Sequence, residues 1–321
     1  MKRRTFIKNT ALGTAAFSTL GVTACTNPVQ KEHPKSMTQK LAKPLISLAQ
    51  WSLNRAFFAK ELDPNDFAAI ASQTYDIHAI EYVNQFYLEQ VNDEAFWQGL
   101  KKRADDNGVK SLLIMVDDEG DLGNIDEKTR HQAVENHYKW VNAAKLLDCH
   151  SIRVNAFGEG EKAAVRSALV DGMGRLCEYA AKENINILIE NHGLYSSDGQ
   201  WIAGIIKEIN LPNMGTLPDF GNWCMSAKWG STQDSTCKKV YDPYQGVLDF
   251  LPFAKGVSAK SYNFNEAGED RIIDYQKMLK VVKDFGYDGY IGIEYEGEEK
   301  SEPEGIRMTK ALIERVWEGL S

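Results

Sequence analysis

Histidine and cysteine are scarce in this 321-residue sequence, which contains six histidines and five cysteines. The cysteines show no Cys-x-x-Cys or cysteine–histidine spacing of the kind that binds structural zinc. A glycine-rich phosphate loop is also missing after the first predicted strand, which argues against an open, doubly wound nucleotide-binding sheet. Any site chemistry in this protein is therefore expected to depend mainly on carboxylates.

Positive charge is also in deficit, because the formal net charge is −8. A nucleic-acid surface needs grouped lysines and arginines that displace counterions from phosphates. The sequence therefore favours a small-molecule partner and argues against nucleic acid. The apolar stretch over residues 11–24 is shorter than the roughly 20 residues that a transmembrane helix needs.

The first 25 residues have the pattern of an export signal rather than of a folded element. Arg3 and Arg4 begin a basic segment, and the weakly apolar run behind it stops at Cys25, which indicates twin-arginine export. The residues before Cys25 resemble a bacterial lipobox, so we expect lipidation there. Residues 26–43 are polar and are expected to be a disordered tether. The protein is then periplasmic and meets the membrane through its lipid only.

The remaining cysteines fall into two groups. Cys224 and Cys237 flank one loop, and an exported protein retains disulfides, so we expect these two to pair. Cys149 and Cys177 lie in apolar surroundings and are expected to be small buried residues.

Residues 44–321 alternate between short apolar strands and helical patterns, which predicts a single (β/α)₈ TIM barrel, an α/β fold. In such barrels function lies in the loops at the carboxyl ends of the strands. The expected strands are 46–51, 77–83, 110–116, 150–155, 185–190, 214–218, 256–260 and 290–294. The expected helices begin near Asp63 and cover 92–103, 127–147, 162–182, 201–209, the region of Gln245, 275–284 and 304–317.

Acidic residues end three of the later predicted strands. The apolar run 185–189 leads into Glu190, the sixth strand leads into Asp219, and the eighth delivers Glu294. A single acid at a strand end is usually a helix cap or an ion-pair partner. Three of them at the same end of one barrel favour a shared site.

Four segments carry a family resemblance: Glu-Asn-His-Gly at 190–193, Leu-Pro-Asp-Phe-Gly-Asn at 217–222, Val-Ser-Ala-Lys at 257–260 and Tyr-Ile-Gly-Ile-Glu-Tyr-Glu-Gly at 290–297. Together they resemble the sugar phosphate isomerase/epimerase family of xylose isomerase-like TIM barrels. The resemblance covers residue 44 to the C-terminus.

That resemblance implies one divalent metal ion at the barrel mouth, bound by Glu190, Asp219 and Glu294. In the family a histidine from the seventh strand completes the set, but here Ser258 stands at that place. His192 lies two residues after Glu190 and is a candidate replacement. Carboxylate ligands favour Mg²⁺ or Mn²⁺, with Zn²⁺ and Co²⁺ as alternatives.

The implied reaction is proton transfer beside a carbonyl through an enediolate, with Glu190 and Glu294 as the catalytic acid and base. This predicts an isomerase or epimerase acting on a sugar or keto-sugar. The same enediolate can expel a leaving group, so a lyase or dehydratase acting on an oxidised sugar is an alternative. Because Ser258 replaces the histidine, a non-catalytic carbohydrate-binding lipoprotein is a second alternative. A nuclease with the same barrel is a distant third.

Further pocket residues are expected on the inward side of the strands or at their ends. Trp51 and Trp223 are candidates for stacking against a sugar ring, whereas Glu296 is expected to point outward. A free or oxidised sugar or a glycoside suits an exported protein better than a sugar phosphate. The sequence does not indicate the oligomeric state. The predicted substrate-binding residues are His192, Lys260, Arg153, Asn222, Glu81 and Trp51.

Overall fold

The computed structural model of this protein describes residues 43–233 and 235–320. The predicted signal, the predicted lipidation site at Cys25 and nearly all of the predicted tether lie outside the described residues. Among the helices that are described, none has both the length and the apolar character required to cross a bilayer.

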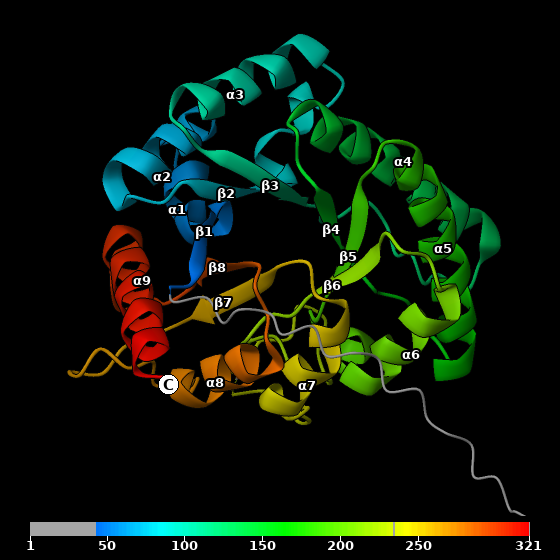
Figure 1. Cartoon of the computed structure of the whole chain (residues 1–321). Helices are drawn as coiled ribbons and strands as arrows, with labels where there is room; N and C mark the ends of the chain where they lie inside the picture. Colours follow the sequence, from blue (N-terminus) through cyan, green and yellow to red (C-terminus); the bar gives the residue numbers. More distant parts are fainter. Residues whose placement is uncertain (1–42, 234, 321) are drawn as a thin grey trace, which may run out of the picture. The chain divides into compact units, whose positions relative to one another are not determined.

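Eight parallel strands curl into a TIM-barrel-like sheet (Figure 1). Their order is β6-β5-β4-β3-β2-β1-β8-β7. β6 and β7 lie at the two ends of this order. Two isolated parallel bridges connect the chain near these strands, one between Thr216 and Ala254 and one between Asp219 and Ser258. The strands are β1 (Leu45–Ala49), β2 (Ala79–Val83), β3 (Lys110–Met115), β4 (Ser151–Asn155), β5 (Asn186–Glu190), β6 (Met214–Leu217), β7 (Val257–Ser261) and β8 (Tyr290–Tyr295).

Helices follow the strands along the chain and surround the barrel, as Figure 1 shows. The α-helices are α1 (Asn54–Phe58), α2 (Phe67–Tyr75), α3 (Glu94–Asp106), α4 (Glu127–Leu146), α5 (Lys162–Lys182), α6 (Gly199–Ile209), α7 (Pro243–Phe250), α8 (Tyr275–Phe285) and α9 (Glu302–Gly319). Short 3₁₀ helices cover Gln50–Leu53, Pro64–Asp66, Asn84–Phe86, Leu88–Gln90, Leu194–Ser197 and Leu251–Phe253. The alternation predicted from the sequence is therefore present.

Aspartates fix where many of these helices begin. The side chain of Asp126 accepts a hydrogen bond from the backbone N–H of Thr129, and Asp274 does the same for Lys277. Such an N-cap satisfies an otherwise unpaired backbone donor and stabilises a helix by about 1 kcal/mol. Asp63, Asp93, Asp198 and Asp242 repeat the arrangement.

The barrel interior contains a compact apolar layer, and polar groups gather toward the carboxyl ends of its strands. Alternate residues on each strand point inward, so the same strands also contribute side chains to the larger core beneath the helices. The apolar cluster that this layer belongs to consists of Ala49, Ala79, Val83, Leu112, Leu113, Met115, Leu188 and Leu217. It positions the polar strand ends rigidly around one opening.

Candidate functional site

Three carboxylates converge at the carboxyl ends of the strands. Glu190 ends β5, Asp219 follows β6 and Glu294 lies near the end of β8. One carboxylate oxygen from each lies within 4.8 Å of the others. All three side chains are buried, at 1%, 0% and 4% exposure respectively. The trio singled out from the sequence therefore forms one cluster.

Asn191 follows Glu190 and connects it to Asp219 through side-chain hydrogen bonds. Its amide nitrogen donates to the backbone oxygen of Asp219 over 3.0 Å, and its amide oxygen accepts from the Asp219 backbone N–H over 2.8 Å. Gly193 allows the chain to turn directly after this segment, because its φ is +96°. A Cβ atom there would lie only 2.1 Å from the backbone oxygen of Ala227. The sequence Glu190 to Gly193 thus links β5 to the loop that follows β6.

Arg153 anchors Glu190 from the neighbouring strand β4. Its Nε lies 2.7 Å from Glu190 Oε2, and one of its terminal nitrogens lies 2.5 Å from Asp117 Oδ1. Glu190 Oε2 nevertheless has no well-directed hydrogen bond, so the contact is chiefly one of charge. Burial raises the pKa of Glu190 well above its usual range, and repulsion from Glu294 and Asp219 adds to the shift although Arg153 opposes it.

Ser258 bridges the other two acids. Its hydroxyl oxygen lies 2.7 Å from Asp219 Oδ2 and 2.6 Å from Glu294 Oε2. A hydroxyl has one hydrogen, so it donates to one carboxylate and satisfies the second only when that carboxyl is protonated. Burial raises the pKa of Asp219 to about 7, and the charge on Glu294 adds to this although Lys260 opposes it. The bridge therefore suits a cluster that retains a proton when no cation is bound.

Lys260 brings a buried ammonium group to the same acids. Its Nζ lies 3.3 Å from Glu296 Oε1, 3.5 Å from Glu294 Oε1 and 3.9 Å from Asp219 Oδ2. Desolvation lowers the pKa of Lys260, but these carboxylates outweigh it and raise that pKa well above its ordinary value. The lysine is therefore charged, and it also lies 3.3 Å from the amide oxygen of Asn222.

Carboxyl groups outnumber cationic side chains around the trio. Only two cationic side chains make the ion pairs described above, against five carboxyl groups: Asp117, Glu190, Asp219, Glu294 and Glu296. Glu190 Oε2, which has a charge contact with Arg153 but no directed hydrogen bond, is a candidate ligand atom. An all-carboxylate set matches hard divalent ions. The buried acidic trio could thus bind a metal ion.

A cavity of about 340 Å³ is lined by Glu294, whereas Glu190 and Asp219 lie behind its wall. Trp51 lies in its wall and donates from Nε1 to Glu296 Oε1 over 2.6 Å. Five of the six predicted substrate-binding residues line this cavity, namely Trp51, Arg153, His192, Asn222 and Lys260. The structure therefore brings most of the predicted pocket together.

Glu81 is placed differently. It is the third of the five residues of β2 and lies two residues before Val83, which ends the strand. Val83 lines the cavity, and Glu81 does not. Its carboxylate accepts from Ser47 over 2.6 Å and occupies space left by Gly292, where a Cβ would approach Glu81 Oε1 to 2.5 Å. Burial raises the pKa of Glu81 to about 7. It is buried inside the barrel rather than exposed to the cavity.

His192 is part of a polar chain in the cavity wall. Its Nδ1 lies 2.8 Å from the amide oxygen of Asn155, whose amide nitrogen donates to Asp117 Oδ1 over 2.6 Å. Burial lowers the pKa of His192 well below its ordinary value, and Arg153 adds to the shift. Among the described residues the cluster suited to a metal consists of the three acids without His192.

Two expectations about neighbouring residues were wrong. Glu296 lines the cavity instead of pointing outward, because it lies two residues after Glu294 and shares its side of the chain. Trp223 is fully buried against Tyr241 and Phe250, which excludes contact between its ring and a sugar.

Asp117 and Trp229 also line the cavity and were not singled out from the sequence. Asp117 had a usable signal, because it follows a predicted strand as the other acids do. Trp229 had none, since it lies in the long connection between β6 and α7.

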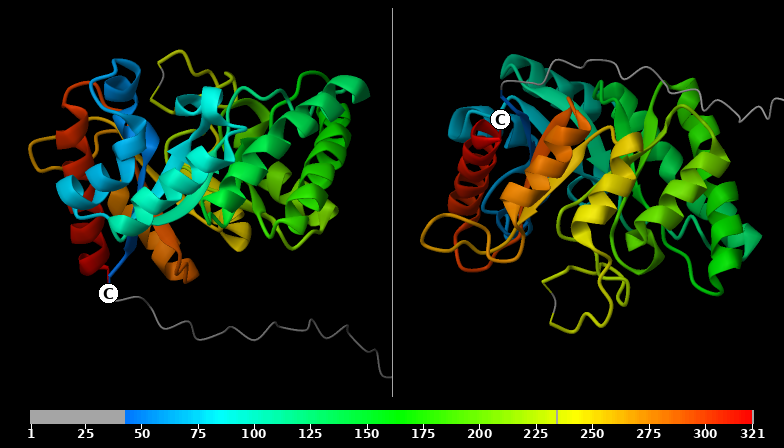
Figure 2. Two further views of the ribbon diagram at one scale, coloured as in Figure 1. Left: turned by 90° about the horizontal axis from the view of Figure 1, so that it is seen from above. Right: turned by 60° about the horizontal axis from the view of Figure 1, so that its bottom comes forward.

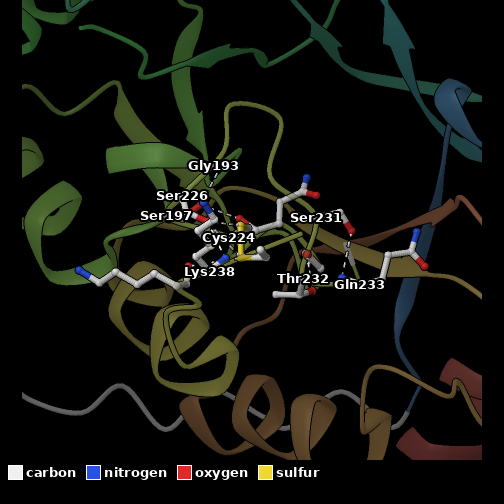
Figure 3. The surroundings of a disulfide bond; sticks show 12 residues. Gly193, Ser197, Cys224, Ser226, Ser231, Thr232, Gln233 and Lys238 are labelled. Atoms are coloured by element: carbon white, nitrogen blue, oxygen red, sulfur yellow. Dashed lines mark hydrogen bonds between the residues drawn. A yellow bond between two sulfur atoms is a disulfide. The ribbon is translucent and has the colours of Figure 1, made fainter. Parts of the chain in front are cut away.

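A disulfide joins Cys224 to Cys237 in that connection, the pair expected from the sequence. Figure 3 shows its surroundings, with Ser226 and Lys238 beside the two sulfur atoms. The Ser226 hydroxyl accepts from the backbone N–H of Lys238 over 2.8 Å. Cys149 and Cys177 are free and buried, also as expected.

Comparisons with known proteins agree with the architecture. Among curated proteins, no sequence matches this chain. The chain is similar to the solved structure of 3-keto-D-glucoside 4-epimerase from E. coli, with 14% identity, a TM-score of 0.62 and coverage of 84% of this chain and 99% of that one. It also resembles the IolI protein with a zinc atom, with 14% identity, a TM-score of 0.63 and coverage of 86% and 99%.

A xylose isomerase-like TIM barrel protein from Mycobacterium smegmatis in complex with magnesium gives 13% identity, a TM-score of 0.61 and coverage of 87% and 97%. Such low identities show the fold alone. The family model described as xylose isomerase-like TIM barrel matches residues 68–312, which is most of the chain. The protein belongs to the xylose isomerase-like TIM barrel family.

Proposed function

We propose that this protein is a divalent-metal-dependent isomerase or epimerase that acts on a sugar or keto-sugar. The observation that carries the proposal is the buried trio of Glu190, Asp219 and Glu294, of which Glu294 lines the cavity. The solved structures with similar folds add support, since their names include a sugar epimerase and proteins with zinc or magnesium.

The three acids of the trio are the proposed ligands, and their hard oxygen atoms favour Mg²⁺ or Mn²⁺. A bound divalent ion supplies Lewis-acid polarisation of a carbonyl and its neighbouring hydroxyl, which makes the intervening C–H acidic. The donor set of this chain fits that role, because Glu190 offers a buried oxygen without a directed hydrogen bond.

Glu190 and Glu294 are the proposed proton carriers. They come from β5 and β8, which lie on different sides of the strand ring, so a substrate carbon between them can lose a proton to one and regain it from the other. Arg153 keeps Glu190 in place through its charge contact. Return of the proton to the opposite face or to the neighbouring carbon gives an epimer or an isomer.

Lys260 and Asn222 are the proposed partners of the developing negative charge on the enediolate. The Lys260 ammonium is buried and charged, so it stabilises an oxyanion more strongly than an ammonium in water would. The Asn222 amide nitrogen is buried without a hydrogen-bond partner, and it can donate to a substrate oxygen.

Incubation of the metal-loaded protein with a panel of keto-sugars in deuterated water tests the proposal, because deuterium at carbon reports the abstracted proton. Glu190→Gln and Glu294→Gln should each lower exchange by about a hundredfold or more. Glu298→Gln, which alters an exposed acid after β8, should leave it unchanged.

Undiminished exchange in either trio variant would refute the assignment of roles. Release of a leaving group after exchange would instead identify a lyase or dehydratase. Absence of both exchange and stoichiometric metal would favour the carbohydrate-binding alternative.

We further propose that the chain is exported by the twin-arginine route and lipidated at Cys25. The support comes from the sequence of residues 1–25, and the Cys224–Cys237 disulfide suits an oxidising compartment. In bacteria producing the full chain, a fatty-acid label should enter the wild type and not Cys25→Ser. A product that keeps its first 24 residues would contradict the proposal.

A further inference from the structure

Trp229 is an exposed indole at the edge of the candidate site. It is 41% exposed, whereas Trp97, Trp140, Trp223 and Trp317 are at most 2% exposed. Its backbone φ is +58°, in the left-handed region that bulky residues seldom adopt. A large apolar side chain held in an unfavourable backbone conformation beside a cavity suggests a binding role rather than a packing role.

The side chains around Trp229 fix the direction of its ring. The indole meets the ring of His192 edge-on with 4.7 Å between centroids, and that of Phe157 with 5.0 Å. The preceding Lys228 places its ammonium 4.6 Å from the centre of the Phe157 ring and 3.2 Å from Asp121. Trp229 is therefore anchored on the residues that follow β4 and β5.

The backbone on both sides of Trp229 is anchored as well. The N–H of Leu194 donates to Ala227 over 3.1 Å, and the N–H of Gly230 donates to His192 over 3.4 Å. The N–H of Cys224 donates to Gly230 over 3.1 Å, which closes the segment onto the disulfide. Gly193 forms an antiparallel bridge with Lys228, and Figure 2 shows this connection, in yellow-green, extending away from the strands.

The cavity therefore has a buried part that contains charged groups and an aromatic rim. Glu294, Lys260 and Arg153 lie in the buried part with Val83 and Met115, all at most 4% exposed, while Trp229 at the rim is 41% exposed. Trp51 follows β1 on the wall opposite β5, since three strands lie between β1 and β5 in either direction around the ring. The rings that Trp229 contacts are those of Phe157 and His192, so a ring that packs on its exposed face lies at the rim, on the solvent side of the buried acids.

We propose that Trp229 forms a rim subsite that binds the apolar face of a second sugar ring, so that the substrate is a glycoside rather than a free monosaccharide. This inference rests on the proposed function for the identity of the reacting ring. The face of a pyranose presents C–H groups that pack on an indole, while its hydroxyls remain available to polar groups such as Asp118 and Gln85 in the same cavity wall.

Calorimetric titration of the folded chain, with and without Mn²⁺, tests the rim subsite. The probes are maltose, cellobiose, trehalose and sucrose, each compared with glucose and fructose. At least one disaccharide should bind about tenfold more tightly than its monosaccharides. Trp229→Ala should remove that advantage and leave monosaccharide binding unchanged, and Trp229→Phe should retain part of it. Phe285→Ala removes an exposed aromatic ring at the end of α8 and should change nothing.

Equal binding of disaccharides and monosaccharides, or no binding by any disaccharide, would overturn the inference. An equal loss of both classes in Trp229→Ala would also overturn it, because the ring would then contact the reacting sugar. These outcomes are separate from the proposed function, since deuterium exchange on a keto-sugar is tested with Glu190→Gln and Glu294→Gln in a chain that keeps Trp229.

Discussion

The two halves of the barrel mouth hold their buried cations in different ways. On the β3 to β5 half, Arg153 contacts Asp117 and Glu190 over 2.5 and 2.7 Å. On the β6 to β8 half, Lys260 faces its acids over 3.3 to 3.9 Å. A planar guanidinium suits fixed partners, whereas an ammonium on a flexible stem does not require one geometry. The first half is therefore a rigid support, and the second half is where charge can be rearranged during a reaction.

Arg153→Met should have the largest effect on stability, because it leaves Asp117 and Glu190 buried without their cation. Breaking a buried pair in this way typically costs about 3–5 kcal/mol. Urea denaturation measures the loss. Arg166→Met, which removes an exposed pair with Glu208, should cost less than about 1 kcal/mol. Similar losses in the two variants would contradict the rigid-support role.

Glu81 belongs to neither half and tests the effect of burial, the largest cause of its raised pKa, on an acid in this barrel. Its folded pKa is raised from 4.5 to about 7, so the unfolded chain ionises first as pH rises. Stability should therefore fall between about pH 4.5 and pH 7, by up to about 3 kcal/mol. Glu81→Gln should remove this contribution and leave the one that Asp219 makes over the same range, as followed by denaturation, and should leave sugar binding unchanged. An unaltered pH profile would show that Glu81 is not the cause.

Lys260→Met tests the second half. Turnover should fall by about a hundredfold, which is about 2.7 kcal/mol of barrier, because the enediolate loses a buried cation. Mn²⁺ binding should persist, since the three acids remain. Lys280→Met, which alters an exposed pair on α8, is the matched control. Full turnover in Lys260→Met would assign the lysine a purely structural role.

Ser258→His is expected to have a smaller effect on metal affinity. An imidazole at this position adds a ligand beside Asp219 and Glu294, so Mn²⁺ or Zn²⁺ affinity should rise by about tenfold, or about 1.4 kcal/mol. Competition with a chelator measures the gain, and Ser258→Ala should show none. Unchanged affinity in the histidine variant would mean that Ser258 lies outside the ligand shell.

The alternating pattern of the sequence was enough to predict the barrel, because buried parallel strands are continuous apolar runs with visible ends. The same logic located Glu190, Asp219 and Glu294. It failed for Glu81, because this acid lies in the middle of β2 rather than at its end, and its carboxylate is buried inside the barrel. It failed for Glu296 because the inward alternation of β8 extends beyond its last residue.

Trp229 could not be predicted in this way. Its position depends on the backbone contacts of Gly193 and Gly230 and on the path of a long loop, and no periodic pattern encodes these. Asp117 is an intermediate case, since its strand-end signal was present but its role depends on Arg153 reaching it from β4.

Titration of the metal-free protein with Mn²⁺, followed by electron paramagnetic resonance, tests the central claim most directly. The account predicts one bound ion per chain in the wild type and an affinity at least about a hundredfold lower in Asp219→Asn, which removes one of the three ligands. Absence of stoichiometric binding in the wild type, or the same affinity in the variant, would contradict the assignment of the acidic trio as a metal centre.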